Sequence, residues 1–253
     1  MCLLVLAWNV HPRYRLVLAA NRDEFHERPA DAMAWWPDRR IVAGRDLQAG
    51  GTWLAVAGDS HFGVVTNYRD LQGPLPGAPS RGQLILEFLD SREPAPEFSA
   101  RLAPQIARYS GFNLLVGDAT HLSYVANRAA QPVRELPAGV FGLSNHLLDT
   151  PWPKLVRTRV RFEQLLASEA LAHEDLFALL SDREPSQEHE LPESGLPREF
   201  ERALSAPFIV NERYGTRSST ILLIGHDGAV DIAERRYDPL GRTTGRAAFE
   251  FQT

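Results

Sequence analysis

Cys2 is the residue of this sequence whose type and position most clearly suggest chemistry. It is the only cysteine in 253 residues and stands directly after Met1, so removal of Met1 would leave a thiol and a free α-amine on one residue. An α-amine titrates near ~7.7–8.0 and a thiol near ~8.5. The amine can therefore accept the proton whose loss creates the thiolate nucleophile. The pattern predicts nucleophilic catalysis by Cys2 after processing, and the alternative is a small core residue on a buried strand.

An acidic partner for this thiol is predicted at Asp23. The tetrad Asn21-Arg22-Asp23-Glu24 comes directly after a second strand-like run, residues 15–20, which follows the first across a turn containing Pro12. A tight hairpin returns the end of its second strand to the start of its first. Asp23 would then lie beside Cys2 and orient its amine or hydrogen bond to the thiol. The alternative is a charged turn in which the aspartate bonds to its own backbone.

Two asparagines and one arginine are further candidates for catalysis. Asn67 and Asn145 each follow an apolar strand-like run, where a side-chain amide can stabilise an oxyanion. Arg217 begins a late apolar run, and beside a thiol its guanidinium would lower the thiol pKa or hold a substrate carboxylate. Asparagine is also a common strand terminator, and an arginine at a strand edge is usually solvated.

Substrate contacts are expected from the polar tetrad and from tryptophans. The aromatic pair at residues 35–36 can form the wall of a site for a flat or acyl ligand, or can be simple packing. Lys154 is the only lysine and hence the only candidate for Schiff-base chemistry, and we assign it no role. The residues expected to contact substrate are Asn21, Arg22, Trp35, Trp36 and Trp53.

Composition excludes several classes of protein. With 44% hydrophobic and 23% charged residues, the chain can bury a full core, and we expect one domain over residues 1–253. A net charge of −5 at pH 7 gives no basic footprint for nucleic acid. The apolar opening is shorter than the ~18 residues of a membrane span. A single cysteine allows no internal disulfide and indicates a reducing, cytoplasmic setting.

Strand-like segments dominate both ends of the chain and helical patterns its middle. Gly/Asp turns connect three predicted hairpins, residues 54–65, 114–125 and 222–232. The continuous apolar run at residues 3–6 indicates a strand covered on both faces.

A first helix is predicted after Ser80, which has capping-box spacing with Gln83 and precedes apolar residues at helical intervals, Leu84, Ile85, Phe88 and Leu89. Further helices are predicted from Thr150-Pro151 and over residues 173–181. Prolines leave residues 92–109 only weakly helical, and residues 182–198 have the composition of a surface loop. Strands at both termini with helices between them predict an α+β fold.

The combined motifs resemble those of the NRDE family, whose eukaryotic members are called transport and Golgi organisation protein two. The resemblance covers residues 1 to about 225. The motifs that carry it are Met1-Cys2, Asn21-Arg22-Asp23-Glu24-Phe25 with Arg28-Pro29, Gly44-Arg45-Asp46, Gly50-Gly51-Thr52-Trp53-Leu54, Thr66-Asn67-Tyr68-Arg69, Gly142-Leu143-Ser144-Asn145 and Tyr214-Gly215-Thr216-Arg217.

This resemblance implies an N-terminal-nucleophile hydrolase-like fold, a four-layer αββα sandwich. More distantly, the pattern is similar to that of cysteine amidases acting on cholylglycine or penicillin V. By that similarity Cys2 matches the nucleophile, Asp23 its acidic partner, Asn67 and Asn145 the asparagines near the oxyanion, and Arg217 a late arginine. Those amidases have an arginine three positions before the aspartate, where this chain has Ala20.

Two functional hypotheses follow. The first is an N-terminal-nucleophile hydrolase that cleaves a C–N amide, or a thioester, of a small substrate through Cys2. The second, which the resemblance implies, is a non-catalytic protein that binds or traffics haem, acyl-CoA or another lipid. In that case the thiolate of Cys2, or one of His11, His26 and His61, would ligate the haem iron. The eight histidines show no metal-ligand spacing, so we predict no metal and no cofactor, and the oligomeric state is left open.

Overall fold

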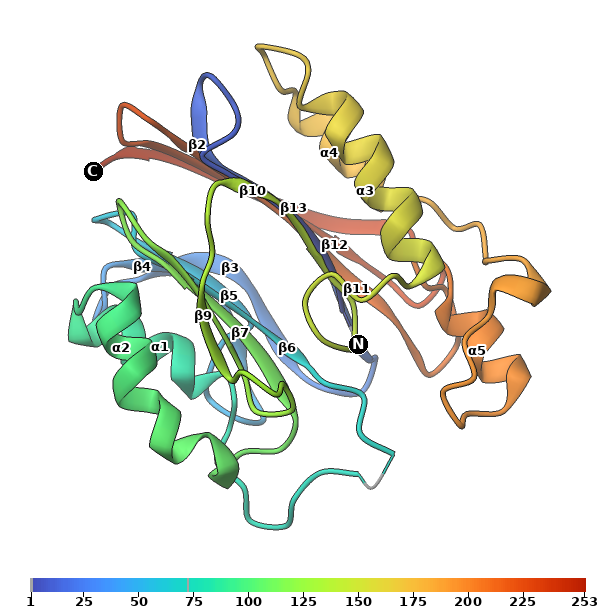
Figure 1. Cartoon of the computed structure of the whole chain (residues 1–253). Coiled ribbons are helices and arrows are strands. Elements are labelled where there is room, and N and C mark those ends of the chain that lie inside the picture. Colours follow the sequence, from blue (N-terminus) through green and yellow to red (C-terminus); the bar gives the residue numbers. More distant parts are fainter. Residues whose placement is uncertain (1, 72) are drawn as a thin grey trace.

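Two antiparallel β-sheets lie face to face, and helices cover their outer faces (Figure 1). The structure, a computed structural model, describes residues 2–71 and 73–253. The six-stranded sheet has the order β10 (Gly139–Leu143), β1 (Cys2–Trp8), β2 (Tyr14–Phe25), β11 (Tyr214–Gly225), β12 (Ala229–Tyr237), β13 (Thr243–Gln252). The seven-stranded sheet runs in chain order, β3 (Ala30–Trp36), β4 (Ile41–Asp46), β5 (Leu54–Ala57), β6 (Phe62–Asn67), β7 (Phe112–Gly117), β8 (Leu122–Ala126), β9 (Val133–Glu135).

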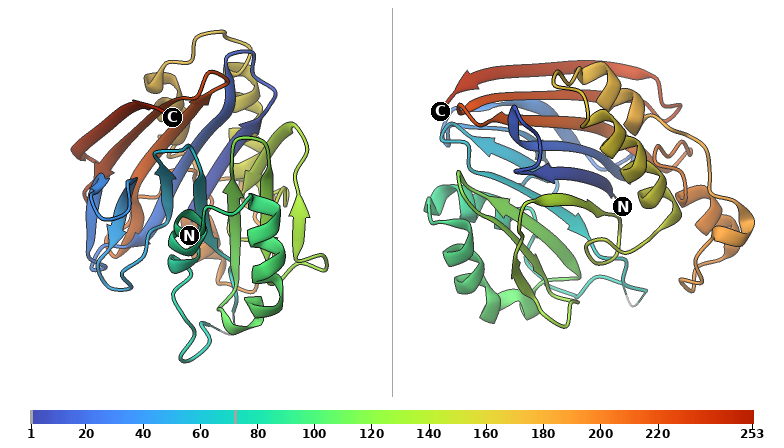
Figure 2. Two further views of the ribbon diagram at one scale, coloured as in Figure 1. Left: turned by 90° about the vertical axis from the view of Figure 1, so that its left-hand side faces the viewer. Right: turned by 45° about the horizontal axis from the view of Figure 1, so that its top comes forward.

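Each sheet has its own pair of covering helices. Figure 2 shows α3 and α4 (yellow) across the six-stranded sheet, with α1 and α2 (green) beyond the other sheet. A shorter helix, α5, and two 3-10 helices, η1 and η2, complete the described elements. The helix bounds are α1 Gln83–Ser91, α2 Ala95–Leu102, η1 Ala103–Arg108, α3 Pro153–Leu165, α4 His173–Leu180, η2 Glu188–Glu190 and α5 Arg198–Leu204.

The apolar opening strand shows why four layers form. Leu4 and Leu6 pack between the two sheets, whereas Leu3 and Val5 pack under α3 and α4. A third cluster joins the seven-stranded sheet to α1 and α2. Side chains alternate along a strand, so a continuous apolar run serves a sheet buried on both faces. The predicted α+β fold with four αββα layers is confirmed.

The predicted hairpins are present, and one sheet is indeed built from both ends of the chain. Residues 2–25 and 214–252 contribute five of its strands, and β10 adds the sixth. The predicted helix over residues 173–181 is confirmed as α4. Every described helix is too short or too polar to cross a bilayer.

The helix starts differ from the sequence prediction. The Gly82 N-cap of α1 receives no side-chain hydrogen bond, so the predicted capping box at Ser80 is wrong. The helix expected from Thr150-Pro151 begins at Pro153, because that second proline occupies its first turn. Residues 95–108 are more helical than predicted, since Pro94 and Pro104 stand at helix starts, where no N–H is needed.

Candidate functional site

The hairpin of β1 and β2 brings Cys2 to the gap between the two sheets. In the strand register Cys2 lies opposite Arg22, and Arg22 lies opposite Ser218 of β11. Directly opposed residues point to the same face of a sheet. The thiol and the guanidinium therefore share the face that carries Leu4 and Leu18, which packs against the seven-stranded sheet.

The surroundings of the thiol keep it protonated at rest. Burial is the main cause that raises the pKa of Cys2 above its ordinary value, and the nearby carboxylate of Asp23 raises it further. A backbone hydrogen bond from Asp23 and the charge of Arg22 act in the opposite direction. Cys2 is half-buried. Nucleophilic attack from this site therefore needs a base for the thiol proton.

The backbone nitrogen of Cys2 has a specific acceptor. It donates a hydrogen bond of 3.1 Å to Oδ1 of Asn145. The other end of this side chain is also fixed, because Nδ2 donates to Oγ of Ser144 at 3.1 Å. Asn145 has a φ of 59°, which asparagine tolerates better than most residues, and its carbonyl accepts from the Arg69 N–H at 2.7 Å. Asn145 thus binds the backbone nitrogen of Cys2. The oxyanion role expected for it from the sequence stays a prediction.

Asp23 lies on the opposite face of β2 from Arg22, buried under the helical layer. Its Oδ1 accepts a hydrogen bond of 2.7 Å from Oγ1 of Thr216, and its carbonyl accepts one of 2.9 Å from the Tyr214 hydroxyl. Burial raises the pKa of Asp23, and the charge of Lys154 is the largest influence that lowers it. Asp23 is therefore linked to the thiol by charge and to β11 by hydrogen bonds.

Lys154 belongs to this buried network, although the sequence analysis assigned it no role. The side chain is 3% exposed, and Nζ donates to the carbonyl of Leu204 at 2.9 Å. Burial lowers the pKa of Lys154, while the negative charges of Asp23 and Cys2 raise it. The sequence contained a signal for the burial of Lys154. It lies one helical turn before Thr158, on the face of α3 that also buries Leu155.

A cavity of about 980 Å³ opens next to the thiol. It lies within the size range of small-molecule sites, ~300–1,000 Å³. Of the predicted site residues, the cavity lining contains Cys2, Arg22, Asp23, Trp53 and Asn67.

The cavity wall combines four arginines with an apolar part. The arginines are Arg22, Arg28, Arg69 and Arg81, and the large apolar and aromatic residues are Trp53, Phe25, Tyr68, Leu75, Leu196, Phe200, Leu204, Ile209 and Tyr214.

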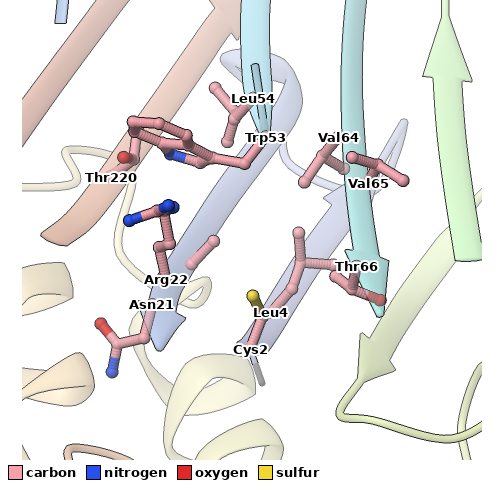
Figure 3. Close-up of a pocket in the computed structure, with 11 residues that line it drawn as sticks. Cys2, Leu4, Asn21, Arg22, Trp53, Leu54, Val64, Val65, Thr66 and Thr220 are labelled. Atoms are coloured by element: carbon pink, nitrogen blue, oxygen red, sulfur yellow. The ribbon is translucent and has the colours of Figure 1, made fainter. Parts of the chain in front are cut away.

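Arg22, Trp53 and Asp46 form the base of this wall. The Arg22 guanidinium carbon lies 4.3 Å from the centre of the Trp53 ring, and Figure 3 shows the two side chains facing each other above Cys2. Nη2 of Arg22 is 3.9 Å from Oδ2 of Asp46, which also pairs with Nε of Arg28 at 2.8 Å. Gly44 leaves room for the indole, since a Cβ there would lie 2.4 Å from the Trp53 ring.

Asn21 has a structural part in the tetrad. Its Nδ2 donates to the carbonyls of Leu180 and Pro207, both at 2.9 Å, and its Oδ1 accepts from Oγ of Ser219 at 2.6 Å. Figure 3 shows its side chain pointing away from Trp53 and Arg22. Asn21 lines a recess of about 10 Å³ beside Cys2 but does not line the large cavity.

Three other predicted site residues lie away from the cavity. Trp35 packs against Phe249 and Phe251 of β13, and Trp36 is buried with its Nε1 donating to the carbonyl of Ala43. Arg217 occupies an irregularity of β11, between the pairs formed by Thr216 and Ser218.

The Arg217 guanidinium donates to the carbonyls of Phe25 and Arg28, at 2.8 and 3.0 Å. The structure therefore brings Cys2 and Asp23 together but does not bring Arg217 to them.

Asn67, the other asparagine predicted to contact an oxyanion, reaches the cavity. It ends β6, lines the cavity and is only half-buried, and no described residue hydrogen bonds to its side chain.

The histidines named as possible haem ligands contact other groups of the chain. A ring nitrogen of His11 contacts the Ser168 carbonyl, and a ring nitrogen of His26 contacts the Asn211 carbonyl. Nδ1 of His61 lies 3.1 Å from Asp59. Across residues 2–71 and 73–253, no three His, Cys, Asp or Glu side chains are grouped to hold a metal ion.

Comparison with known proteins assigns the chain to a family. The family described as Transport and Golgi organisation 2 matches residues 1–239. The chain belongs to this family. The Transport and Golgi organization protein 2 homolog of Homo sapiens is 34% identical over 257 residues, covering 93% of this chain and 92% of the human protein. The mouse homolog is 33% identical with the same coverage, and the Drosophila melanogaster protein 26% with 92% and 91%.

Membership of the Transport and Golgi organisation 2 family confirms the resemblance drawn from the motifs. Among solved structures, an N-acylethanolamine-hydrolyzing acid amidase ortholog of Caenorhabditis elegans is similar, with a TM-score of 0.40 and 10% identity. The match covers 88% of this chain and 92% of the amidase. A likeness of this size is distant and says nothing about the substrate of this family member.

Proposed function

We propose that this chain is an amidase whose nucleophile is the Cys2 thiol once Met1 has been removed. The observation that carries the proposal is the hydrogen bond from the Cys2 nitrogen to Oδ1 of Asn145, beside a thiol that opens on a large cavity. After removal of Met1 this nitrogen is the α-amine. An acceptor fixed at both ends would then hold the amine next to the sulfur whose proton it must take.

The proposed reaction proceeds in two stages. The neutral α-amine takes the thiol proton, and the thiolate attacks the carbonyl carbon of an amide or thioester. The side-chain amide of Asn67 donates to the oxyanion, the bond to the leaving group breaks, and the α-ammonium returns its proton to that group. Water then attacks the acyl-Cys2 thioester with the α-amine as base, which releases a carboxylic acid and restores the thiol.

Asp23 and Lys154 support this chemistry from behind the strand. The Asp23 carboxylate lies close enough to raise the pKa of the thiol. It would likewise make an amine on the same residue a stronger base and stabilise the ammonium that forms when the thiol proton is transferred. Lys154 in turn favours the ionised form of Asp23. We assign both residues to positioning and electrostatics, because the cavity-facing groups Cys2 and Asn67 make the contacts with the reacting carbonyl.

The test compares two forms of the protein on fatty-acyl amides. One form is released from a cleavable fusion so that it begins with Cys2, and the other keeps a non-removable N-terminal extension. We expect hydrolysis by the first form only, and Cys2→Ala in that form should abolish it. Cys2→Ser keeps a nucleophile of higher pKa and should retain a small part of the rate. Equal turnover by the extended form or by Cys2→Ala would refute the proposal.

A second candidate is ligand binding without turnover, as for haem, acyl-CoA or another lipid. The observation that favours it is the apolar part of the cavity wall, which can hold an acyl chain whether or not Cys2 reacts. Titration with haemin and with an acyl-CoA, followed by thermal stability, separates the hypotheses. Stabilisation by either ligand without any hydrolysis would support the binding protein, and no stabilisation would rule it out.

We also infer a cytoplasmic setting and a small-molecule partner. A lone thiol at a catalytic position is preserved in a reducing compartment, and the cavity has the volume of a small-molecule site. Cell fractionation tests the location, and recovery of the protein in an oxidising compartment would contradict it.

A further inference from the structure

The charges around the thiol end of the cavity leave one positive charge without a carboxylate. Arg22 and Arg28 share Asp46, and Arg28 also lies 3.9 Å from Glu24. Arg81 is the third arginine of this region. The third carboxylate of this region, Asp23, lies on the opposite face of β2, where Lys154 is the main positive charge that acts on it. On the cavity face, three guanidinium groups against the carboxylates of Glu24 and Asp46 leave a surplus of one positive charge.

Arg81 is the guanidinium that lacks an acidic partner. Its Nη1 donates to the carbonyl of Gly111 at 3.0 Å, and no carboxylate of the described residues forms an ion pair with it. The charges that act on it are those of Glu24, Arg28 and Cys2, which places it in the electrostatic environment of the thiol, and its desolvation lowers its pKa. A partly buried cation without a carboxylate provides a binding site for an anion.

The position of Arg81 is fixed by the backbone around it. The next residue, Gly82, packs closely against the segment that precedes β5. A Cβ on Gly82 would lie 2.7 Å from the carbonyl oxygen of Thr52. A Cβ on Gly51 would lie 2.6 Å from the Gly82 backbone. Because these backbones touch, the backbone that carries Arg81 is a tightly packed part of the cavity wall. Little backbone conformational entropy is therefore lost there when an anion binds.

Another part of the same cavity is apolar. Phe25, Leu75 and Phe200 line it and are largely exposed, with Phe200 61% exposed. Leu204 and Ile209 continue this surface toward the interior. Exposed apolar side chains gathered along one cavity are typical of a site for an apolar ligand.

We propose that the substrate is a fatty-acyl amide whose amine portion carries one carboxylate, that is, an N-acyl amino acid. This inference rests on the proposed amidase function. The acyl chain lies on the apolar part of the cavity, the amide carbonyl reaches Cys2, and the carboxylate pairs with Arg81. One carboxylate matches the single surplus charge, whereas a dianionic phosphate would also face Glu24 and Asp46. Hydrolysis consumes water, breaks the C–N bond and yields a fatty acid and an amino acid.

The test uses two substrates that differ only in the charged group, N-lauroylglycine and N-lauroylethanolamine. The form beginning with Cys2 should prefer the glycine compound by about 10-fold or more in kcat/KM, and Arg81→Gln should bring that ratio near one. Arg81→Lys should restore part of the preference, since it keeps the charge but not the planar fork. Arg108→Gln, at an exposed arginine of η1, is the matched control and should keep the ratio.

A binding measurement separates this inference from the proposed function. Calorimetry on Cys2→Ala should show tighter binding of N-lauroylglycine than of N-lauroylethanolamine, and Cys2→Ala/Arg81→Gln should lose the difference. That pattern without any hydrolysis by the parent chain would reject the amidase and retain the carboxylate site. Equal binding of the two compounds would overturn the site. The site would also be overturned if Arg81→Gln lowered kcat/KM equally for both substrates and slowed the alkylation of Cys2. Arg81 would then act by stabilising the thiolate of Cys2.

Discussion

The contact between Asn145 and the nitrogen of Cys2 decides how the single residues of the site are interpreted. In an intact chain this nitrogen is an ordinary peptide N–H, and a hydrogen bond from a strand end to a buried asparagine is structural. In a chain that begins at Cys2, the same geometry holds an α-amine beside the thiol. The burial that raises the pKa of the thiol explains why such a base is needed.

The reactivity of Cys2 in the chain that keeps Met1 should reflect this burial. A raised pKa means a smaller thiolate fraction at any pH below it, so alkylation by iodoacetamide should be slower than that of a free cysteine peptide near pH 7. The rate should still be rising above pH ~8.5, where the peptide levels off. Mass spectrometry of the labelled protein gives both rates. If the alkylation rate of the protein levelled off at the same pH as that of the peptide, or at a lower pH, this would contradict the proposed environment.

Lys154 and Asp23 should behave as a coupled buried pair. Lys154→Met removes the charge that favours ionised Asp23, and we expect a loss of about 3–5 kcal/mol in the free energy of unfolding, because a buried carboxylate is left uncompensated. Asp23→Asn should restore part of that loss in the double variant, which urea unfolding measures. Strictly additive losses would show that the two charges do not interact.

Some of these residues were predictable from sequence and others were not. Cys2, Asp23, Trp53 and Asn67 reach the cavity because the hairpin and the motif positions were interpreted correctly. Arg217 does not, because an extra residue in β11 redirects it, and such an irregularity leaves no periodic signal. Arg81 was missed for a related reason. It is a candidate because no carboxylate of the described residues pairs with it in the folded chain, and spacing along the sequence does not show that.

At the scale of elements, the geometry of the cavity wall depends on close contacts between backbone and side chains. The strand β4 carries Gly44 beneath the Trp53 ring, and Trp53 in turn faces Arg22 beside the thiol. The strands were predictable from turn residues and apolar runs. The edge strand β13, with its alternating exposure, and the helix α5 after the polar loop were not predicted, because their burial depends on partners distant in sequence.

A methyl group at Gly44 should disturb the site from a distance. Gly44→Ala would place a Cβ 2.4 Å from the indole, so Trp53 must move, at a cost of about 1–3 kcal/mol in unfolding free energy. Tryptophan fluorescence should shift as well. Gly58→Ala is the matched control, since the nearest atom would lie at 3.7 Å, and it should change stability by no more than about 0.5 kcal/mol. Equal effects of the two substitutions would argue against the packing described.

At the scale of the whole molecule, the four layers serve to place one strand end. The six-stranded sheet supplies Cys2 and Asp23. Trp53 directly precedes β5 and Asn67 ends β6 of the seven-stranded sheet, and α3 supplies Lys154 from outside. They meet around the Cys2 end of β1, on the two faces of the six-stranded sheet. This arrangement accounts for motifs spread over most of the sequence, because each layer contributes a separate segment of chain to the same site.

Trapping the acyl intermediate tests the central claim most directly. The form that begins with Cys2 is mixed with N-lauroylglycine, quenched in acid within the first turnovers and analysed by intact and peptide mass spectrometry. We predict that one lauroyl group is attached to the N-terminal peptide as a thioester that hydroxylamine removes, and that the extended form and Cys2→Ala show none. Product formation without any acylated Cys2 in the burst phase, or an identical adduct on the extended form, would contradict the account.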